Sequence, residues 1–213
     1  MGDEITYFDP TLSYEITGYR PINETQGLDF NPEWFCGARN EYLRTGHYCQ
    51  FPQGTKRFTD YWTEQYKRCR DGMTVNGYTI TGDNYFFLNF YQLPIVDSNN
   101  KASAGRKDGF PRFFVSQYTF FHYYELAKRL HMNCILMKAR SIGFSEINAS
   151  IATNMYTIIP KSNTMVCCFD SGKLSRTLKK VWHALTFLDS STDGGMRRRR
   201  IKNTEWEKIS GVL

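Results

Sequence analysis

The chain has 213 residues, of which 41% are hydrophobic and 23% are charged, and a formal net charge of +6. A chain of this length and composition can bury a substantial core, and one domain with an appendage is the expectation. No run approaches the roughly 18 uninterrupted apolar residues of a membrane span, and the acidic amino terminus lacks the apolar region of a secretory signal. The positive charge favours an anionic partner such as nucleic acid or a nucleotide.

The first half of the chain, residues 1–96, is expected to contain an irregular arm, one helix and a small β-hairpin or meander. Up to about residue 51 the chain is rich in Pro, Gly, Asn and Thr, which predicts turns and short irregular pieces. The run that follows places Phe58, Trp62 and Tyr66 at four-residue steps, which predicts a helix closed by an Asp-Gly pair.

A β-rich region and a linker are predicted next. Within residues 73–96, the pairs Asn76-Gly77 and Gly82-Asp83 punctuate runs of β-favouring residues, which indicates a hairpin or meander. Pro94 is expected to end the last of these runs. Residues 97–110 are polar, basic and rich in Ser and Gly, and they are predicted to form an exposed linker.

From residue 111 onward the pattern indicates alternating helices and short strands. An aromatic-rich amphipathic helix comes first, and two short apolar runs about 30 residues apart are then separated by a helix-length segment. A second amphipathic helix ends the pattern. Strands joined through a helix at this distance predict right-handed parallel β-α-β units, with helices on both faces of the sheet. The two apolar runs are residues 133–138 and 163–169.

The junction between the first apolar run and its helix is predicted to be a phosphate-binding loop. Such a loop needs a strand to aim it, glycine to let backbone N–H groups approach phosphate, and a helix whose amino-terminal dipole faces the anion. The usual pattern is G-x-x-x-x-G-K-[ST], and the octet here is KARSIGFS, residues 138–145. Gly143 and Ser145 are in place, Phe144 occupies the lysine position, and Lys138 occupies the first glycine position.

A lysine at the strand end can deliver its charge to the same phosphate. The flexible stem of Lys138 can cross the loop, and Arg140 adds a second cation. Residues 111–213 are therefore predicted to be the first part of a P-loop ATPase domain, an incomplete α/β fold with a parallel sheet flanked by helices. A strand, turn and helix that bind no ligand remain the alternative.

The octet and the segment ahead of it resemble parts of the terminase large subunits of tailed bacteriophages. KARSIGFSE is similar to the deviant Walker A loop of this family, in which some members carry lysine at the first position and an aromatic residue where lysine is usual. YTITGDNYFFLNFYQLPI resembles a stretch that some members place ahead of the ATPase core. The resemblance spans residues 78–169.

The resemblance implies a role for each residue of the octet. Lys138 would bind the β- and γ-phosphates, Ser145 would ligate Mg²⁺, and Arg140 would be a catalytic arginine finger acting in cis. Gln117 is the best-placed candidate to read adenine, although an ordinary polar helix position is an equally good interpretation. The implied ATP-binding residues are Lys138, Ala139, Ser141, Ile142, Gly143, Phe144, Ser145 and Gln117.

The implied function is a motor that couples ATP hydrolysis to translocation of double-stranded DNA into a procapsid. The implied partners are double-stranded DNA, the portal protein, the small terminase subunit and further copies of the chain in a ring, in the host cytoplasm and not at a membrane. The acidic Walker B strand of the family is not found, because Asp170, the only acid that ends a later apolar run, lies too early in the sequence for it. The clustered carboxylates of the family's nuclease are not found either. The chain therefore resembles the first part of a longer ATPase.

Two other functions are consistent with the sequence. The first is a non-catalytic docking module for portal or small subunit with a degenerate nucleotide site, because residues 1–96 are rich in aromatic residues of the kind that anchor interfaces. The second is a helicase or another P-loop enzyme, against which Phe144 argues.

Overall fold

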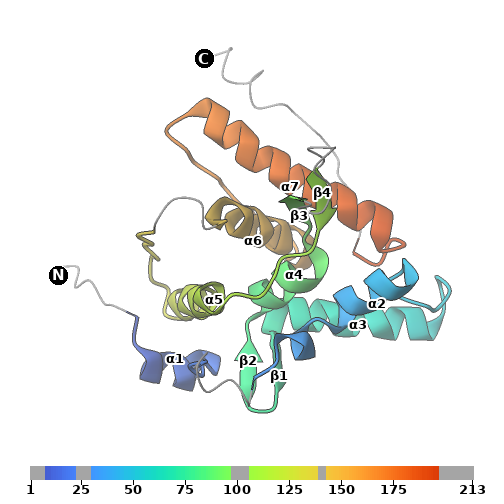
Figure 1. Cartoon of the computed structure of the whole chain (residues 1–213), viewed down its shortest axis with the longest axis horizontal. Coiled ribbons are helices and arrows are strands. Elements are labelled where there is room, and N and C mark those ends of the chain that lie inside the picture. The colour runs from blue at the N-terminus through green and yellow to red at the C-terminus, as the bar shows by residue number, and fades with distance from the viewer. Residues whose placement is uncertain (1–7, 23–29, 97–105, 139–142, 197–213) are drawn as a thin grey trace.

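The computed structural model describes residues 8–22, 30–96, 106–138 and 143–196 (Figure 1). In these residues the architecture is mixed α/β, with seven α-helices, one short 3-10 helix and two small antiparallel sheets. No helix in this part of the chain combines the length and hydrophobicity needed to cross a bilayer. The helices are α1 (Pro10–Thr17), η1 (Pro32–Phe35), α2 (Gly37–Thr45), α3 (Lys56–Asp71), α4 (Gly82–Phe90), α5 (Val115–Arg129), α6 (Phe144–Ile158) and α7 (Ser171–Ser191).

Helix α4 is the centre of the molecule, as Figure 1 shows. It contacts α2, α3, α5 and α6, and all nine of its residues are buried. The prediction that Gly82-Asp83 is a turn between β-runs was wrong. The hydroxyl oxygen of Thr81 accepts the backbone N–H of Asn84 and caps a helix there. Burial on every side removes the alternation of polar and apolar residues by which sequence patterns reveal a helix.

The helix and the hairpin predicted before α4 are confirmed. α3 begins after Thr55, whose hydroxyl accepts the N–H of Phe58, and it ends at Gly72. Strands β1 (Met73–Val75) and β2 (Tyr78–Ile80) pair antiparallel around Asn76 and Gly77. Both turn residues have positive φ, at 50° and 76°, as a type I′ hairpin turn requires. The arm ahead of them contains the short helices α1, η1 and α2 instead of being irregular.

A second hairpin corrects two predictions about residues 93–110. β3 (Leu93–Val96) pairs antiparallel with β4 (Arg106–Gly109), from Leu93 opposite Gly109 to Val96 opposite Arg106. Pro94 therefore lies inside a strand and does not end it, which a sheet of only two edge strands permits. The end of the predicted linker is a strand, and residues 97–105 lie outside the described part.

The two apolar runs of the predicted parallel sheet are not strands in the structure. Residues 132–138 and 163–169 belong to neither helix nor sheet, and all strand pairs among the described residues are antiparallel. A strand needs a neighbour to satisfy its backbone, and the described residues place no strand beside either run. Several side chains are consequently open to solvent, with Met137 93% and Phe169 89% exposed. The helices α5, α6 and α7 predicted around these runs are confirmed.

A buried polar chain joins α1 to α5 and β2. Thr17 Oγ1 lies 2.8 Å from His122 Nδ1, and His122 Nε2 donates to the carbonyl oxygen of Thr79 at 2.8 Å. Burial lowers the pKa of His122 to about 4, although the Thr79 carbonyl and the charge of Glu125 oppose the shift. The imidazole is therefore neutral at pH 7, and its Nδ1 shares the Thr17 hydroxyl with the carbonyl oxygen of Ser13, which lies 2.7 Å from Thr17 Oγ1.

Acidification is expected to destabilise the protein through His122. Because its pKa is about 4 in the folded state and 6.5 in the unfolded state, the unfolded state binds the proton first as pH falls. The stabilisation that comes from the neutral form of His122 is complete above pH 6.5 and is lost as the pH falls toward 4. The free energy of unfolding should fall by about 2 kcal/mol between pH 7.5 and 5. Urea denaturation at both pH values measures it. The same loss in His122→Gln would assign the effect to other groups.

Candidate functional site

The amino-terminal end of α6 opens onto a cationic pocket. Gly143, with φ 74° and ψ 10°, turns the chain into α6, and as the residue at the N-cap it has no side chain with which to cap the first N–H groups of this helix. The positive end of the helix dipole therefore faces the pocket, an arrangement that favours anions. The pocket has a volume of about 490 Å³, and Lys138, Lys173, Arg176 and Lys180 bring four positive charges to its wall.

The structure brings together the octet residues that it describes. Lys138, Gly143, Phe144 and Ser145 all line this one pocket. The ring of Phe144 packs edge-on against Phe120 of α5, with ring centroids 4.8 Å apart. This contact joins the start of α6 to α5. Ala139, Arg140, Ser141 and Ile142 lie outside the described residues.

A second cavity, on α5 and β3, meets the same glycine. Gln117 lies beside the loop, because its Nε2 is 4.0 Å from the place that a Cβ on Gly143 would take. Gln117 and Gly143 both line this cavity of about 540 Å³, whose other walls are mostly apolar. The larger apolar residues of its lining are Phe87, Leu93, Ile95, Phe110 and Phe114. Gly143 is thus common to the cationic pocket and to this apolar cavity.

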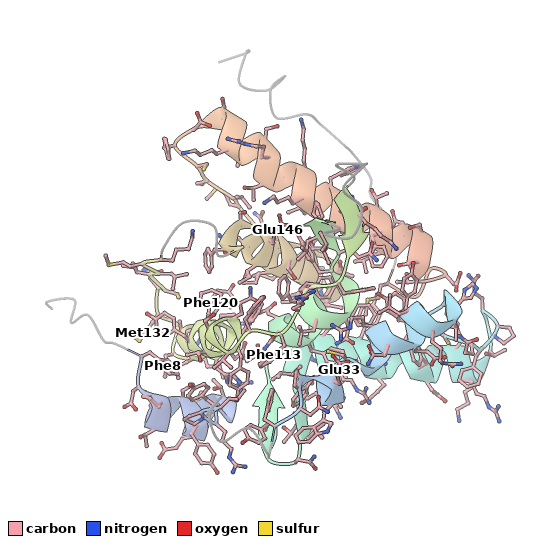
Figure 2. All side chains as sticks on the ribbon, in the orientation of Figure 1. Phe8, Glu33, Phe113, Phe120, Met132 and Glu146 are labelled. Atoms are coloured by element: carbon pink, nitrogen blue, oxygen red, sulfur yellow. The ribbon has the colours of Figure 1, made fainter. Side chains whose placement is uncertain are left out.

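Helix α7 contributes a contact that the sequence analysis missed. The ammonium of Lys180 donates to Ser145 Oγ at 2.7 Å and forms an ion pair with Glu146 Oε1 at 2.7 Å. Glu146, labelled on α6 in Figure 2, also accepts a hydrogen bond from the Tyr91 hydroxyl at 2.7 Å. Burial and the Glu146 carboxylate raise the pKa of Tyr91, which keeps that hydroxyl protonated and donating. Glu146 is therefore fixed from two sides.

The spacing of cations on α7 could have indicated this contact. Lys173, Arg176 and Lys180 follow at steps of three and four residues, which places them on one face of a helix. The prediction of this helix rests on its apolar face alone. Asp170, the acid after the second apolar run, caps α7 by accepting the N–H of Lys173 at 2.7 Å.

The oxygens at the start of α6 are of the kind that Mg²⁺ prefers. Ser145 Oγ and Glu146 Oε1 converge on one cation, the Lys180 ammonium, each at 2.7 Å. The described residues contain no group of three or more His, Cys, Asp or Glu side chains that could hold a metal ion. A serine hydroxyl can supply one oxygen ligand, and a Mg²⁺ ion bound to a nucleotide takes its other ligands from phosphate oxygens and water.

Many aromatic residues of the first 96 positions lie in the core. The largest fully buried side chains include Phe35, Tyr48, Tyr85 and Phe86, whereas Tyr14 and Phe51 are exposed. The fully buried rings cannot anchor a partner, which leaves the exposed and half-buried ones for the docking module considered above.

Comparison of the chain with protein-family models, with curated proteins and with solved structures found no match.

Proposed function

We propose that this chain is the ATP-binding part of a viral DNA-packaging motor of the terminase large-subunit type. The observation that carries the proposal is the convergence of Lys138, Gly143 and Ser145 on one cationic pocket at the start of α6. A polyphosphate is the ligand class that matches this pocket, because it combines several cations with the positive end of a helix dipole.

Each part of ATP has a matching surface in this proposal. The phosphates lie in the cationic pocket, with Lys138 on the β- and γ-phosphates. The base enters the apolar cavity on the other side of Gly143, where the Gln117 amide can donate and accept hydrogen bonds. Mg²⁺, when bound, neutralises charge on the β- and γ-phosphates, and Ser145 would hold it. Arg140 remains the proposed arginine finger.

The parallel sheet of a P-loop ATPase belongs to the same proposal. Lys138 ends the first exposed apolar segment, and Val166, Cys167 and Cys168 of the second segment line the same pocket. Both segments are continuous apolar runs, as is typical of strands covered on both faces. We therefore place two strands of the sheet at residues 133–138 and 163–169, with neighbouring strands supplied by further chain.

The motor function itself is inferred from the resemblance to terminases. Hydrolysis of ATP would drive double-stranded DNA into a procapsid, with a ring of copies acting on the portal beside the small subunit in the host cytoplasm. The basic composition supports a polyanionic partner such as DNA.

Binding of a fluorescent ATP analogue with Mg²⁺ tests the phosphate site. Lys138→Ala is expected to weaken binding by about tenfold or more, because a charge-assisted contact to phosphate is lost. Lys56→Ala removes an exposed lysine at the start of α3 and serves as the control, with affinity expected to stay within about twofold of the wild type. Absence of binding by the wild type, or equal binding by Lys138→Ala, would contradict the proposed site.

A further inference from the structure

Position 144 cannot supply an ammonium to this pocket. It carries a phenylalanine whose ring packs on Phe120, in contact with α5. In the usual loop pattern this position holds the lysine that reaches the β- and γ-phosphates. Lys138 approaches from the other end of the loop, so the place next to Ser145 requires a cation from elsewhere.

We infer that Lys180 of α7 is a phosphate-binding lysine of this site and takes the place left by Phe144. The inference rests on the proposed function and deepens it. Lys180 is 35 positions from Ser145 in sequence, yet its Nζ stands 2.7 Å from Ser145 Oγ, the residue directly after the lysine position. Its charge therefore already lies at the first turn of α6, where the phosphates are proposed to bind.

The surroundings of Lys180 position it and leave it able to bind an anion. An ammonium carries three N–H donors, and Ser145 and Glu146 account for two of them. The side chain of Lys180 is 30% exposed, so an incoming phosphate can reach it. Glu146 acts as a positioning residue: it holds the ammonium at 2.7 Å and is itself held by the Tyr91 hydroxyl.

The rest of the α7 face extends the same charge along the pocket. Arg176 and Lys173 lie one and two turns before Lys180 and line the same pocket. A row of cations favours a ligand that carries several negative charges, such as a chain of phosphates. A triphosphate should therefore bind more tightly here than a monophosphate.

Calorimetric titration with inorganic tripolyphosphate, without metal or base, isolates this contact. Lys180→Ala is expected to weaken binding by about tenfold or more, and Lys180→Arg should restore most of the affinity. The matched control is Lys179→Ala, which removes the same charge from the neighbouring exposed position of α7. That variant should bind within about twofold of the wild type. Lys180→Gln keeps a donor for Ser145 without the charge, so it separates loss of binding from loss of folding, which thermal melting of each variant monitors.

The outcomes distinguish this inference from the proposed function. Unchanged binding by Lys180→Ala and Lys180→Gln, together with weakened binding by Lys138→Ala, overturns the role of Lys180 and leaves the nucleotide site standing. Equal weakening by Lys179→Ala and Lys180→Ala also overturns it, because only net charge would then matter. A wild type that binds neither tripolyphosphate nor ATP overturns both proposals.

Discussion

Asp83→Ala is expected to lower the free energy of unfolding by about 2 kcal/mol, because it removes a buried carboxylate that accepts hydrogen bonds from Lys128 and Asn154. The carboxylate of Asp83 is 4% exposed and accepts from Lys128 Nζ at 2.9 Å and from Asn154 Nδ2 at 2.8 Å. It thereby joins α4 to α5 and α6. Burial alone would lower the pKa of Lys128, but the carboxylates of Asp83 and Glu125 raise it above its ordinary value. Urea denaturation at pH 7 measures the loss.

Asp60→Ala is the control for this substitution. It removes the same charge from an exposed position of α3 and is expected to change the free energy of unfolding by no more than about 0.5 kcal/mol. An Asp83→Ala variant as stable as Asp60→Ala would show that Lys128 and Asn154 find other partners. The ion pair would then not hold the three helices together.

Gly82→Ala is expected to destabilise the protein by about 3 kcal/mol, because α4 begins in direct contact with the end of α3. A Cβ at this position would lie 2.4 Å from the carbonyl oxygen of Cys69 and 2.7 Å from the carbonyl carbon of Arg70. These are backbone atoms of a helix, so the overlap can be relieved only by moving one helix away from the other. Denaturant unfolding, with the circular dichroism of the native state as a check on helix content, measures the effect.

Gly37→Ala is the matched control for the glycine. Gly37 is the first residue of α2, and a Cβ there meets nothing within 4 Å. Alanine should stabilise this helix by up to about 1 kcal/mol through its helix propensity. If the two alanine variants changed stability by the same amount, close packing of α4 on α3 would not be the reason for glycine at position 82.

Elements with a strong local signal could be predicted from the sequence. α3 has a capping Thr55, apolar residues at helical steps and a terminal Gly72, and the first hairpin has Asn76-Gly77 at its turn. These signals lie within a few residues of each other and do not depend on the rest of the fold. For this reason α3 and the first hairpin can both be predicted from the sequence.

Elements that depend on distant neighbours were not found. The aromatic run of α4 has the composition of a strand, and its position among four other helices buries it on all sides. β4 lies in the region predicted to be a linker, because its residues are polar and basic, and it becomes a strand by pairing with β3. Local composition does not contain this information.

The candidate site also contains residues that could be predicted from the sequence and residues that could not. The octet pattern identified Lys138, Gly143 and Ser145, which are close in sequence and line one pocket. The octet pattern could not identify Lys180 or Tyr91. Lys180 contacts Ser145 from α7, and Tyr91, which directly follows α4, contacts Glu146. A loop motif describes one segment, whereas the charge of the pocket is assembled from several.

The two exposed apolar segments also affect how the chain behaves when it is concentrated. Residues 133–138 and 163–169 belong to neither helix nor sheet, and Ile135, Met137, Met165 and Phe169 lie on the surface. Apolar segments without strand partners can associate with the same segments of another molecule. Self-association should therefore increase with protein concentration and diminish when charged residues replace Met137 and Met165, which makes these two positions the first to change in preparing the protein for crystallisation.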